Sequence, residues 1–324
     1  MRVANTDLYE KIKYGHRSKK KVNRMNFWQS IKRDRLLYLL LLPIVVYFII
    51  FKYVPMYGTV IAFKDYRLAD GIFDSKWVGL KHFKSLFSGQ DFWLILRNTI
   101  VLSMYSVLFT FPMPIIISIL LNEVKNKTFK KGVQSILYVP HFISWVVLGG
   151  MVIAILSPST GAVNQLLSLF GIAPIYFLRS TFWWPVSYIA AEIWQSTGWG
   201  TIIYLAAITG IDPELYEATY MDGANKLQQM WHVTLPCIRG TVAIMLILKM
   251  GKVLDVGFEQ VYILQNDVVI SISDVISTYE YRIGLQGMQY SLTTALGLFK
   301  GLIGLILVTI TNRAVKGLGE SGLW

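Results

Sequence analysis

The sequence predicts an all-α, polytopic membrane protein with six membrane spans. The chain has 324 residues, of which 54% are hydrophobic and only 15% are charged, whereas soluble domains carry about 25% charged residues. The mean hydropathy is +0.49. Long apolar runs alternate with polar or basic segments, and an apolar run of about 20 residues is long enough to cross a bilayer as a helix. The basic balance of +12 does not indicate nucleic-acid binding, because the basic residues lie beside the apolar runs.

A polar and strongly basic segment, residues 1–35, precedes the first apolar run. No short apolar core with a small-residue cleavage site comes before that run, so we expect no cleaved signal peptide. Lys and Arg are enriched in cytoplasmic loops and attract anionic lipid headgroups. The segment is therefore expected in the cytosol beside the membrane surface, with the membrane domain occupying residues 36–324.

The positive-inside rule orients the spans. They are expected at about 36–51, 92–121, 133–156, 185–208, 240–264 and 289–312. Lysines concentrate in the short loop after the second span, whereas segment 157–184 has the single basic residue Arg179. The loop is therefore expected inside and segment 157–184 outside. Alternation then places residues 211–239 and both chain termini in the cytosol.

Two local features are expected within this topology. Pro112 and Pro114 should kink the second span, because proline removes a helical hydrogen bond. Residues 77–93 read as an amphipathic helix with aromatic anchors, which is typical of a segment lying in the membrane interface. The first span is rather short at 36–51 and could reach Tyr57.

The polar stretch between the fourth and fifth spans, within residues 211–239, is predicted to fold as two short helices. Asp212 is a favourable N-cap, Pro213 suits the first helical turn, and Gly223 permits a turn between the helices. In the second helix, apolar side chains recur at helical spacing and form one stripe: Leu227, Met230 and Trp231. Pro236 is expected to end that helix. An exposed helix pair with an apolar stripe favours docking onto a partner.

The spacing within this stretch is specific. Glu217-Ala218-Thr219 is followed six positions after Glu217 by Gly223 and, after nine more residues, by Val233-Thr234-Leu235-Pro236. This resembles the EAA loop of ABC importer permeases, with Thr219 in place of the second alanine and Val233 in place of isoleucine. In that family the loop is the coupling helix, which sits in a groove on the cytosolic ATPase. The resemblance assigns this role to Glu217, Ala218, Asp222, Gly223, Ala224, Leu235 and Pro236.

The resemblance covers nearly the whole chain after residue 36. It implies the type I ABC importer permease fold and a bacterial cytoplasmic (inner) membrane location. The implied partners are a second homologous permease, two ATP-binding subunits and an extracytoplasmic solute-binding protein. ATP and Mg would be bound by the ATPase, so this chain is expected to need no cofactor and to act as no enzyme. The similarity is closest to the maltose-importer-like carbohydrate class, including permeases for oligo-uronates such as alginate or aldouronate.

Ionisable residues inside spans are costly and therefore mark candidate sites. At about 1.5 Å per helical residue, Glu192, Lys249 and Lys300 fall near the bilayer midplane, with His141 and Trp145 at the same level. Either these residues pair with one another, or they face a ligand. If Glu192 alone opposes both lysines and Asp255 does not reach them, positive charge is in excess. An acidic oligosaccharide would then supply the missing anion, with Lys249 its preferred partner.

Polar and aromatic side chains alternate on the fourth span, where Gln195 and Ser196 lie among Trp194, Trp199 and Tyr204. Such a face suits a sugar, which offers hydroxyls for hydrogen bonds and apolar ring faces for stacking. Counting from the EAA loop, the resemblance to the larger permease of the maltose importer places sugar binding near the same level. The candidate substrate residues are His141, Glu192, Gln195, Ser196, Trp199, Lys249 and Val253.

Other functions are disfavoured by missing motifs. Cys237 is the single cysteine, so no intrachain disulfide and no cysteine-based metal site is expected. The sequence contains no GxxxxGK[ST], HExxH or GxSxG pattern, and its four histidines are scattered, which disfavours an ATPase or a membrane hydrolase. The main alternative is a secondary transporter or channel that works without ATP, and co-purification with an ATPase would discriminate the two.

Overall fold

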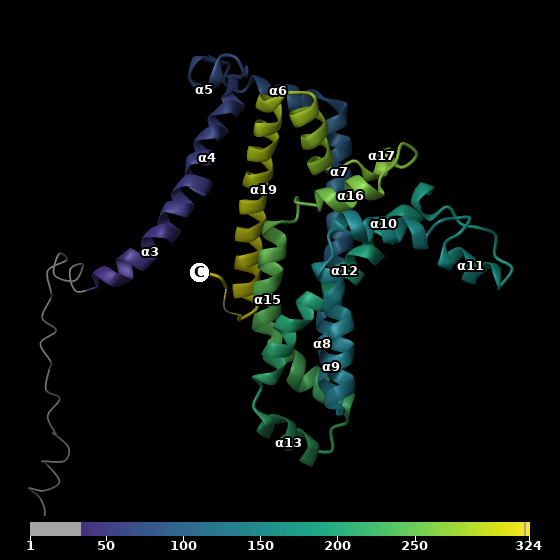
Figure 1. Cartoon of the computed structure of the whole chain (residues 1–324). Coiled ribbons are helices and arrows are strands. Elements are labelled where there is room, and N and C mark those ends of the chain that lie inside the picture. Colours follow the sequence, from purple (N-terminus) through teal and green to yellow (C-terminus); the bar gives the residue numbers. More distant parts are fainter. Residues whose placement is uncertain (1–33, 321) are drawn as a thin grey trace, which may run out of the picture. The chain divides into compact units, whose positions relative to one another are not determined.

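The computed structural model describes residues 34–320 and 322–324, which are mostly helical. The basic segment predicted at residues 1–35 lies outside the described residues apart from its last two positions. The chain divides into two compact units with their boundary between Gly58 and Thr59. Figure 1 shows the chain coloured from its amino end to its carboxyl end.

Within the described residues, four helical runs are long and apolar enough to cross a membrane: Arg35–Phe63, Gln90–Glu123, Lys226–Gly251 and Tyr290–Gly317. A fifth candidate is a bent pair, Lys127–Phe142 with Trp145–Ile155. The 27-residue helix α12 (Trp183–Thr209) covers the fourth predicted span, 185–208. It is not among the span candidates, because polar residues such as Glu192 and Gln195 interrupt its apolar sequence. Length and composition alone thus support four or five spans.

The first unit holds one helical run, α3 (Arg35–Phe48), η1 (Ile49–Tyr53) and α4 (Val54–Met56). The run continues into η2 (Tyr57–Phe63), which crosses the boundary between Gly58 and Thr59, so it is longer than the predicted 36–51.

A five-residue π-helical turn ends two residues before a proline at three places. The turns are η1 before Pro55, η3 (Ser106–Thr110) before Pro112, and η6 (Met230–Thr234) before Pro236. Proline lacks the N–H that would bond the carbonyl four residues earlier, and its ring crowds that carbonyl. The wider turn absorbs this mismatch and lets the helix continue. The prediction that Pro236 ends a helix is therefore wrong, because the run from Lys226 reaches Gly251.

Near its start the second unit contains a small two-stranded sheet with a short helix between the strands. Strands β1 (Lys64–Asp65) and β2 (Lys76–Trp77) pair antiparallel, with Lys64 opposite Trp77, and α5 (Gly71–Asp74) joins them. Helix α6 (Lys81–Ser88) follows, and Gly89 separates it from α7 (Gln90–Tyr105). The amphipathic helix predicted at 77–93 is therefore shorter than expected, since its ends belong to β2 and α7.

The third predicted span, 133–156, is not one straight helix. After α8 (Pro112–Glu123) come α9 (Lys127–Tyr138) and η4 (Val139–Phe142), and α10 (Trp145–Ile155) leaves at an angle of 108°. Pro140 starts the tight turn, and Ile143 and Ser144 then adopt extended backbone. The sequence signal for this break is Pro140, which was read as part of the span.

Helix α12 is the element around which the second unit packs. It follows α11 (Ala162–Ser168) and η5 (Phe177–Arg179) and contacts α8, α9, α15 and α16. Two glycines let neighbours approach it closely. A Cβ at Gly198 would lie 1.9 Å from the carbonyl oxygen of Leu137, and one at Gly200 would lie 2.7 Å from Pro114.

The remaining elements of the described chain are α13 (Pro213–Met221), α14 (Lys226–Gln229), α15 (Leu235–Gly251), α16 (Phe258–Leu264), α17 (Ile270–Ser273), α18 (Ile276–Tyr279), η7 (Glu280–Gln286) and α19 (Tyr290–Gly317).

The fifth predicted span, 240–264, is divided between α15 and α16. Helix α15 stops at Gly251 and residues 252–257 make turns before α16. At this point α19 lies against α15, since a Cβ at Gly304 would be 2.9 Å from the Gly251 carbonyl oxygen.

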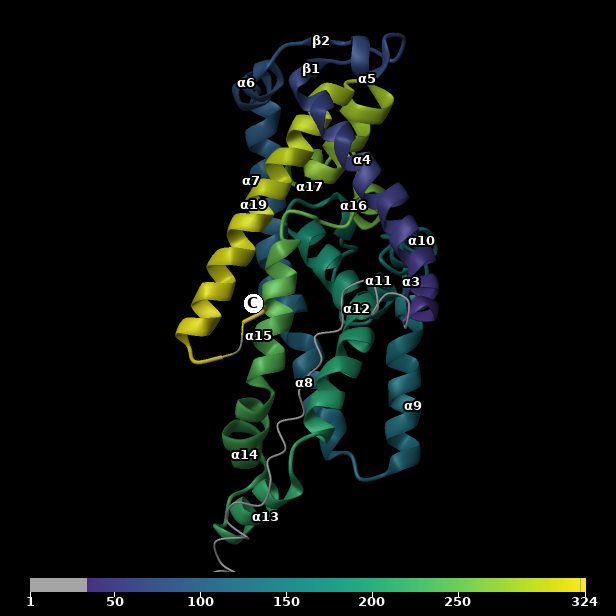
Figure 2. The same ribbon diagram turned by 90° about the vertical axis from the view of Figure 1, so that its left-hand side faces the viewer.

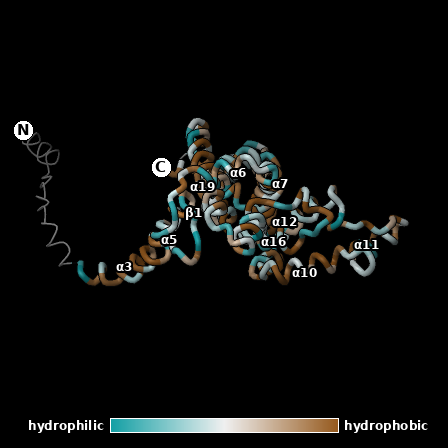
Figure 3. Tube along the Cα trace, turned by 90° about the horizontal axis from the view of Figure 1, so that it is seen from above, coloured by the Kyte–Doolittle hydropathy of each residue, from teal (hydrophilic) through white to brown (hydrophobic). Residues whose placement is uncertain are grey.

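The second unit has two distinct ends. Helix α13 and the turn between α8 and α9 lie at one end, and α6 with β1 and β2 lies at the other (Figure 2). Long stretches of α10 and α19 are hydrophobic when viewed from above (Figure 3). The larger buried core joins α7, α10, α12 and α16, with Leu148, Trp184 and Val261 fully buried. The two loops predicted in the cytosol, the α8–α9 turn and the segment that contains α13, therefore lie at the same end.

Candidate functional site

A polar cavity of about 300 Å³ lies among η3, α10, α12 and the end of α15. It brings together five of the seven candidate substrate residues: Glu192, Gln195, Ser196, Lys249 and Val253. The first three follow one another on a single face of α12, at the i, i+3, i+4 spacing of a helix. Lys249 comes from the last turn of α15, and Val253 from the turns that follow it. The break after Gly251 therefore builds part of the wall. We call this the first cavity.

Ser106, Glu192 and Lys249 form a hydrogen-bonded group in the wall of the first cavity. The Lys249 ammonium donates to Ser106 Oγ at 2.7 Å, and Ser106 donates to Glu192 Oε1 at 2.5 Å. Lys249 Nζ lies 3.4 Å from the same carboxylate oxygen, and the two side chains are 34% and 15% exposed. Glu192 Oε2 is buried and has no hydrogen-bond partner within the described chain. One acceptor therefore remains for a ligand.

The predicted excess of positive charge is wrong. Lys300 Nζ lies 3.3 Å from Asp255 Oδ1 and 3.3 Å from Glu280 Oε2. With Lys249 paired to Glu192, both mid-span lysines have carboxylate partners, which is the pairing that the sequence left open. Asp255 does reach Lys300, although the two are 45 positions apart. Counting residues along a straight span could not predict this contact between Asp255 and Lys300, because α15 ends at Gly251 and residues 252–257 leave the helix axis.

Lys252 is a site residue that the sequence reading missed. It is exposed, it lines the first cavity, and it makes no ion pair with any residue that the structure describes. Asp255 lies three positions further along the chain, but it pairs with Lys300. Trp145 on α10 also lines the first cavity and supplies an aromatic surface there.

The other two candidate substrate residues lie outside the lining of the first cavity. His141 on η4 and Trp199 on α12 stack on each other, with ring centroids 4.8 Å apart and an interplanar angle of 7°. The ring nitrogen Nδ1 of His141 is buried without a partner among the described residues. Tyr204 is fully packed inside the helices at 2% exposure. The polar–aromatic face predicted on the fourth span is therefore divided among several environments.

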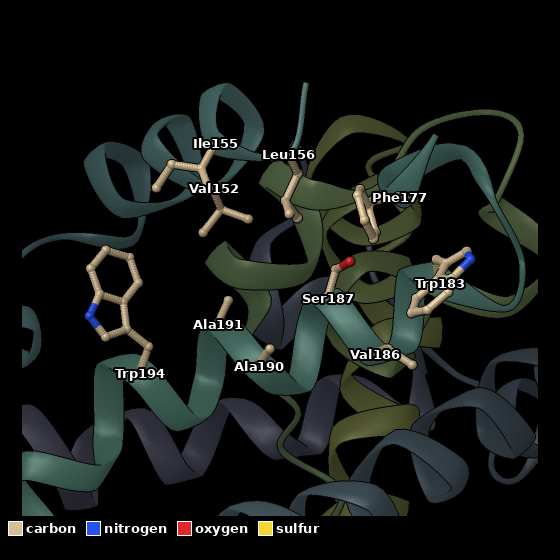
Figure 4. A pocket seen from close by; sticks show the side chains of 10 residues that line it. All are labelled: Val152, Ile155, Leu156, Phe177, Trp183, Val186, Ser187, Ala190, Ala191 and Trp194. Carbon is tan, nitrogen blue, oxygen red and sulfur yellow. The ribbon is translucent and has the colours of Figure 1, made fainter. Parts of the chain in front are cut away.

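Trp194 faces an apolar cavity of about 320 Å³ instead (Figure 4). Figure 4 shows its indole opposite Val152 and Ile155 of α10, with Ser187 and Trp183 further along α12. None of the ten residues that line this cavity is charged. It therefore offers little to a hydroxyl-rich or anionic ligand.

The second predicted site, the helix pair after α12, forms as expected from its capping residues. The Asp212 carboxylate accepts from the Glu214 N–H at 3.0 Å, and Gly223 has φ +79° in the turn. Asn225 and Gln228 form a reciprocal capping box at the start of α14. The seven predicted coupling residues lie on α13, in this turn and at the start of α15: Glu217, Ala218, Asp222, Gly223, Ala224, Leu235 and Pro236.

The helix pair is attached to the rest of the unit by a hydrogen bond and an ion pair, and several of its large apolar side chains are exposed. Tyr216 Oη lies 3.0 Å from Thr234 Oγ1, and Lys226 Nζ lies 3.0 Å from the Glu123 carboxylate at the end of α8. Four large side chains are 67–83% exposed: Tyr220, Met221, Leu227 and Trp231. A hollow of about 730 Å³, lined partly by Glu217 and Ala224, adjoins them. The surface has the form of a docking site.

No metal centre is found in residues 34–320 and 322–324, where no three His, Cys, Asp or Glu residues come together. The free Cys237 is exposed near the start of α15.

Comparison with known proteins identifies the class. The family model for the binding-protein-dependent transport system inner membrane component matches residues 98–320. The chain is 47% identical over 305 residues to the polygalacturonan/rhamnogalacturonan transport system permease protein YteP of Bacillus subtilis, covering 94% of this chain and 95% of that one. It is 43% identical to Protein LplB of the same organism, covering 93% and 94%.

Solved structures agree. A bacterial ABC transporter involved in the import of the acidic polysaccharide alginate contains a chain that is 44% identical, with a TM-score of 0.83, covering 89% of this chain and 98% of that one. A second structure is of a bacterial alginate ABC transporter in complex with an alginate pentasaccharide-bound periplasmic protein. Its matching chain is 43% identical, with a TM-score of 0.84, and the match covers 92% of this chain and 99% of that one. The all-α permease fold predicted from the sequence is confirmed. The chain belongs to the family of inner membrane components of binding-protein-dependent transport systems.

Proposed function

We propose that this chain is a permease subunit of an ATP-driven importer for acidic oligosaccharides and that the first cavity holds the sugar in transit. The observation that carries the proposal is the ammonium of Lys252, which lies in the wall of a polar cavity and has no ion-pair partner among residues 34–320 and 322–324. Relatives at 47% and 44% identity are named for polygalacturonan and alginate transport, and both polymers are built from carboxylated sugars. The permease itself performs no bond chemistry.

The first cavity supplies the groups that a uronate ring needs. Lys252 offers N–H donors to the carboxylate, and Gln195 offers both a donor and an acceptor to ring hydroxyls. The unpartnered Glu192 Oε2 accepts from a hydroxyl. Trp145 provides a flat apolar face for the ring. Lys249 positions Glu192 through Ser106 and holds its charge balanced.

The helix pair at α13 and α14 is the proposed coupling site, with its exposed apolar side chains set into the ATPase. The helical run from Lys226 to Gly251 then connects this surface directly to the first cavity. Its 26 residues span about 39 Å at 1.5 Å per residue. A displacement of the docking surface therefore moves Lys249 at the far end of the same helix.

The complete importer would contain a second permease, two ATPase subunits that bind ATP and Mg, and an extracytoplasmic solute-binding protein. It would sit in the bacterial inner membrane with both termini of this chain in the cytosol. This orientation follows from the lysine-rich α8–α9 turn, which lies at the same end as α13 (Figure 2).

The test is uptake by the assembled importer in vesicles, with its binding protein, of an oligo-uronate and of a neutral oligosaccharide of equal length. Lys252→Gln should lower oligo-uronate uptake about tenfold or more, because a hydrogen bond to a charged group contributes about 1.5–3 kcal/mol. Lys125→Gln, in the distant α8–α9 turn, is the matched control. Preference of the wild type for the neutral sugar, or uptake without ATP, would contradict the proposal.

A further inference from the structure

A second polar cavity, of about 480 Å³, adjoins the first and shares Asp255 with it. Its other walls come from α16, η7 and α19. Lys300 lines it from the eleventh position of α19, one of the apolar span candidates. A charged residue at such a place faces protein or a water-filled path and not lipid. The two cavities are therefore parts of one polar path, separated by residues 252–257.

Aromatic rings form one wall of the second cavity. Phe258, Tyr281 and Tyr290 line it. The Tyr281 ring packs against two neighbours that also stack on each other, with its centroid 5.1 Å from that of Phe258 and 5.3 Å from that of Tyr262. Tyr262 belongs to this aromatic group but does not line the cavity. A ring fixed in this way offers an immobile surface on which the apolar face of a sugar can stack.

The charges of the second cavity differ from those of the first. The Lys300 ammonium lies 3.3 Å from a carboxylate oxygen of Asp255 and of Glu280, so one cation meets two anions. An ammonium has three N–H donors, and these two contacts leave one for a ligand. An entering carboxylate would face two like charges at close range, which is unfavourable. A hydroxyl can accept from Lys300 and donate to Glu280 at once.

We propose that the second cavity binds a neutral sugar ring of the oligosaccharide whose carboxylated ring occupies the first cavity. The inference rests on the proposed function and deepens it. The first cavity has the unpaired cation Lys252, judged over the described residues, and selects a carboxylate. The second has a net negative group and a fixed aromatic wall, and it selects hydroxyls on an uncharged ring. A substrate of mixed composition satisfies both, whereas a chain made only of uronates places a carboxylate beside Asp255 and Glu280.

The experiment compares two tetrasaccharides, one made only of uronates and one in which uronates alternate with a neutral deoxyhexose. Uptake of each by the assembled importer gives a mixed-to-uniform ratio. Because the same binding protein delivers both sugars, its own selectivity cancels when variants are compared. Tyr281→Ala should lower the mixed-to-uniform ratio about three- to tenfold through loss of stacking. Tyr281→Phe keeps the aromatic ring and should therefore keep the wild-type ratio. Tyr176→Ala, whose exposed ring lines neither cavity, is the matched control and should leave the ratio unchanged.

A charge variant tests the second half of the inference. Glu280→Gln removes one of the two anions, keeps Asp255 for Lys300, and should raise uptake of the all-uronate sugar relative to the mixed one. Equal loss of both sugars in Tyr281→Ala, an unchanged ratio in Glu280→Gln, or the same shift in Tyr176→Ala would overturn the inference. Failure of the wild type to transport either sugar overturns the proposed function itself, and the inference with it.

Discussion

The ion pair between Lys249 and Glu192 gives the prediction with the most direct structural basis. At 3.4 Å and an effective dielectric constant of about 20, two unit charges attract by about 5 kcal/mol before the cost of desolvation. Exposed pairs contribute about 0–1 kcal/mol, while breaking a buried pair costs about 3–5 kcal/mol. Exposures of 34% and 15% lie between these cases. We therefore expect a coupling energy of about 1–3 kcal/mol.

The measurement is a double-mutant cycle on unfolding in mixed detergent micelles. Lys249→Gln alone should be the most destabilised variant, because it leaves the Glu192 carboxylate with only Ser106 as a partner. Glu192→Gln combined with Lys249→Gln should recover much of the loss. Lys252→Gln serves as the control and should stay within about 0.5 kcal/mol of wild type, as exposed substitutions usually do. A coupling energy near zero, or an equal loss in Lys252→Gln, would refute the reasoning.

Three further outcomes follow from the loops. Gly223→Pro should abolish ligand-stimulated ATPase activity of the importer while membrane insertion persists, since its φ of +79° and the N–H donated to Tyr220 are both incompatible with proline; normal stimulation would contradict this. An impermeant thiol reagent should label a cysteine at Leu166 from outside but reach the exposed native Cys237 only after permeabilisation, and the reverse pattern would invert the topology. Asn225→Ala should cost about 1 kcal/mol of local stability, which faster hydrogen exchange in α14 would report.

The sequence predicted the elements whose signals are local. Capping residues Asp212 and Gly223 act through their own backbone neighbours, so the helix pair after α12 could be placed correctly. The apolar runs and lysine clusters gave the all-α fold and the arrangement of its ends. Five candidate substrate residues lie together in the first cavity. They could be chosen from the sequence because helical spacing places residues on one face, and because their distance from the coupling loop is counted in residues along the chain. The roles of these residues stay predictions.

What the sequence could not predict depends on contacts between distant segments. Lys300 finds Asp255 and Glu280 only because residues 252–257 and η7 approach α19. For the same reason Lys252 has no ion-pair partner within the part of the chain that the structure describes, since nearby Asp255 pairs with Lys300. His141 stacks on Trp199 instead of lining the cavity, because the chain bends by 108° between η4 and α10.

The two helix breakers on either side of α15 have opposite outcomes, and the difference has a physical cause. Pro236 lies behind a π-helical turn that makes room for its ring, so the helix passes through it. Gly251 lies where α19 packs tightly, with its own Cβ position only 2.7 Å from Val308, and the helix ends there. A continuous helical run therefore extends from the proposed ATPase surface to the wall of the first cavity and stops at that wall. A break at Pro236 would have separated the proposed coupling surface from the cavity, whereas the break at Gly251 leaves Lys252 in the cavity wall.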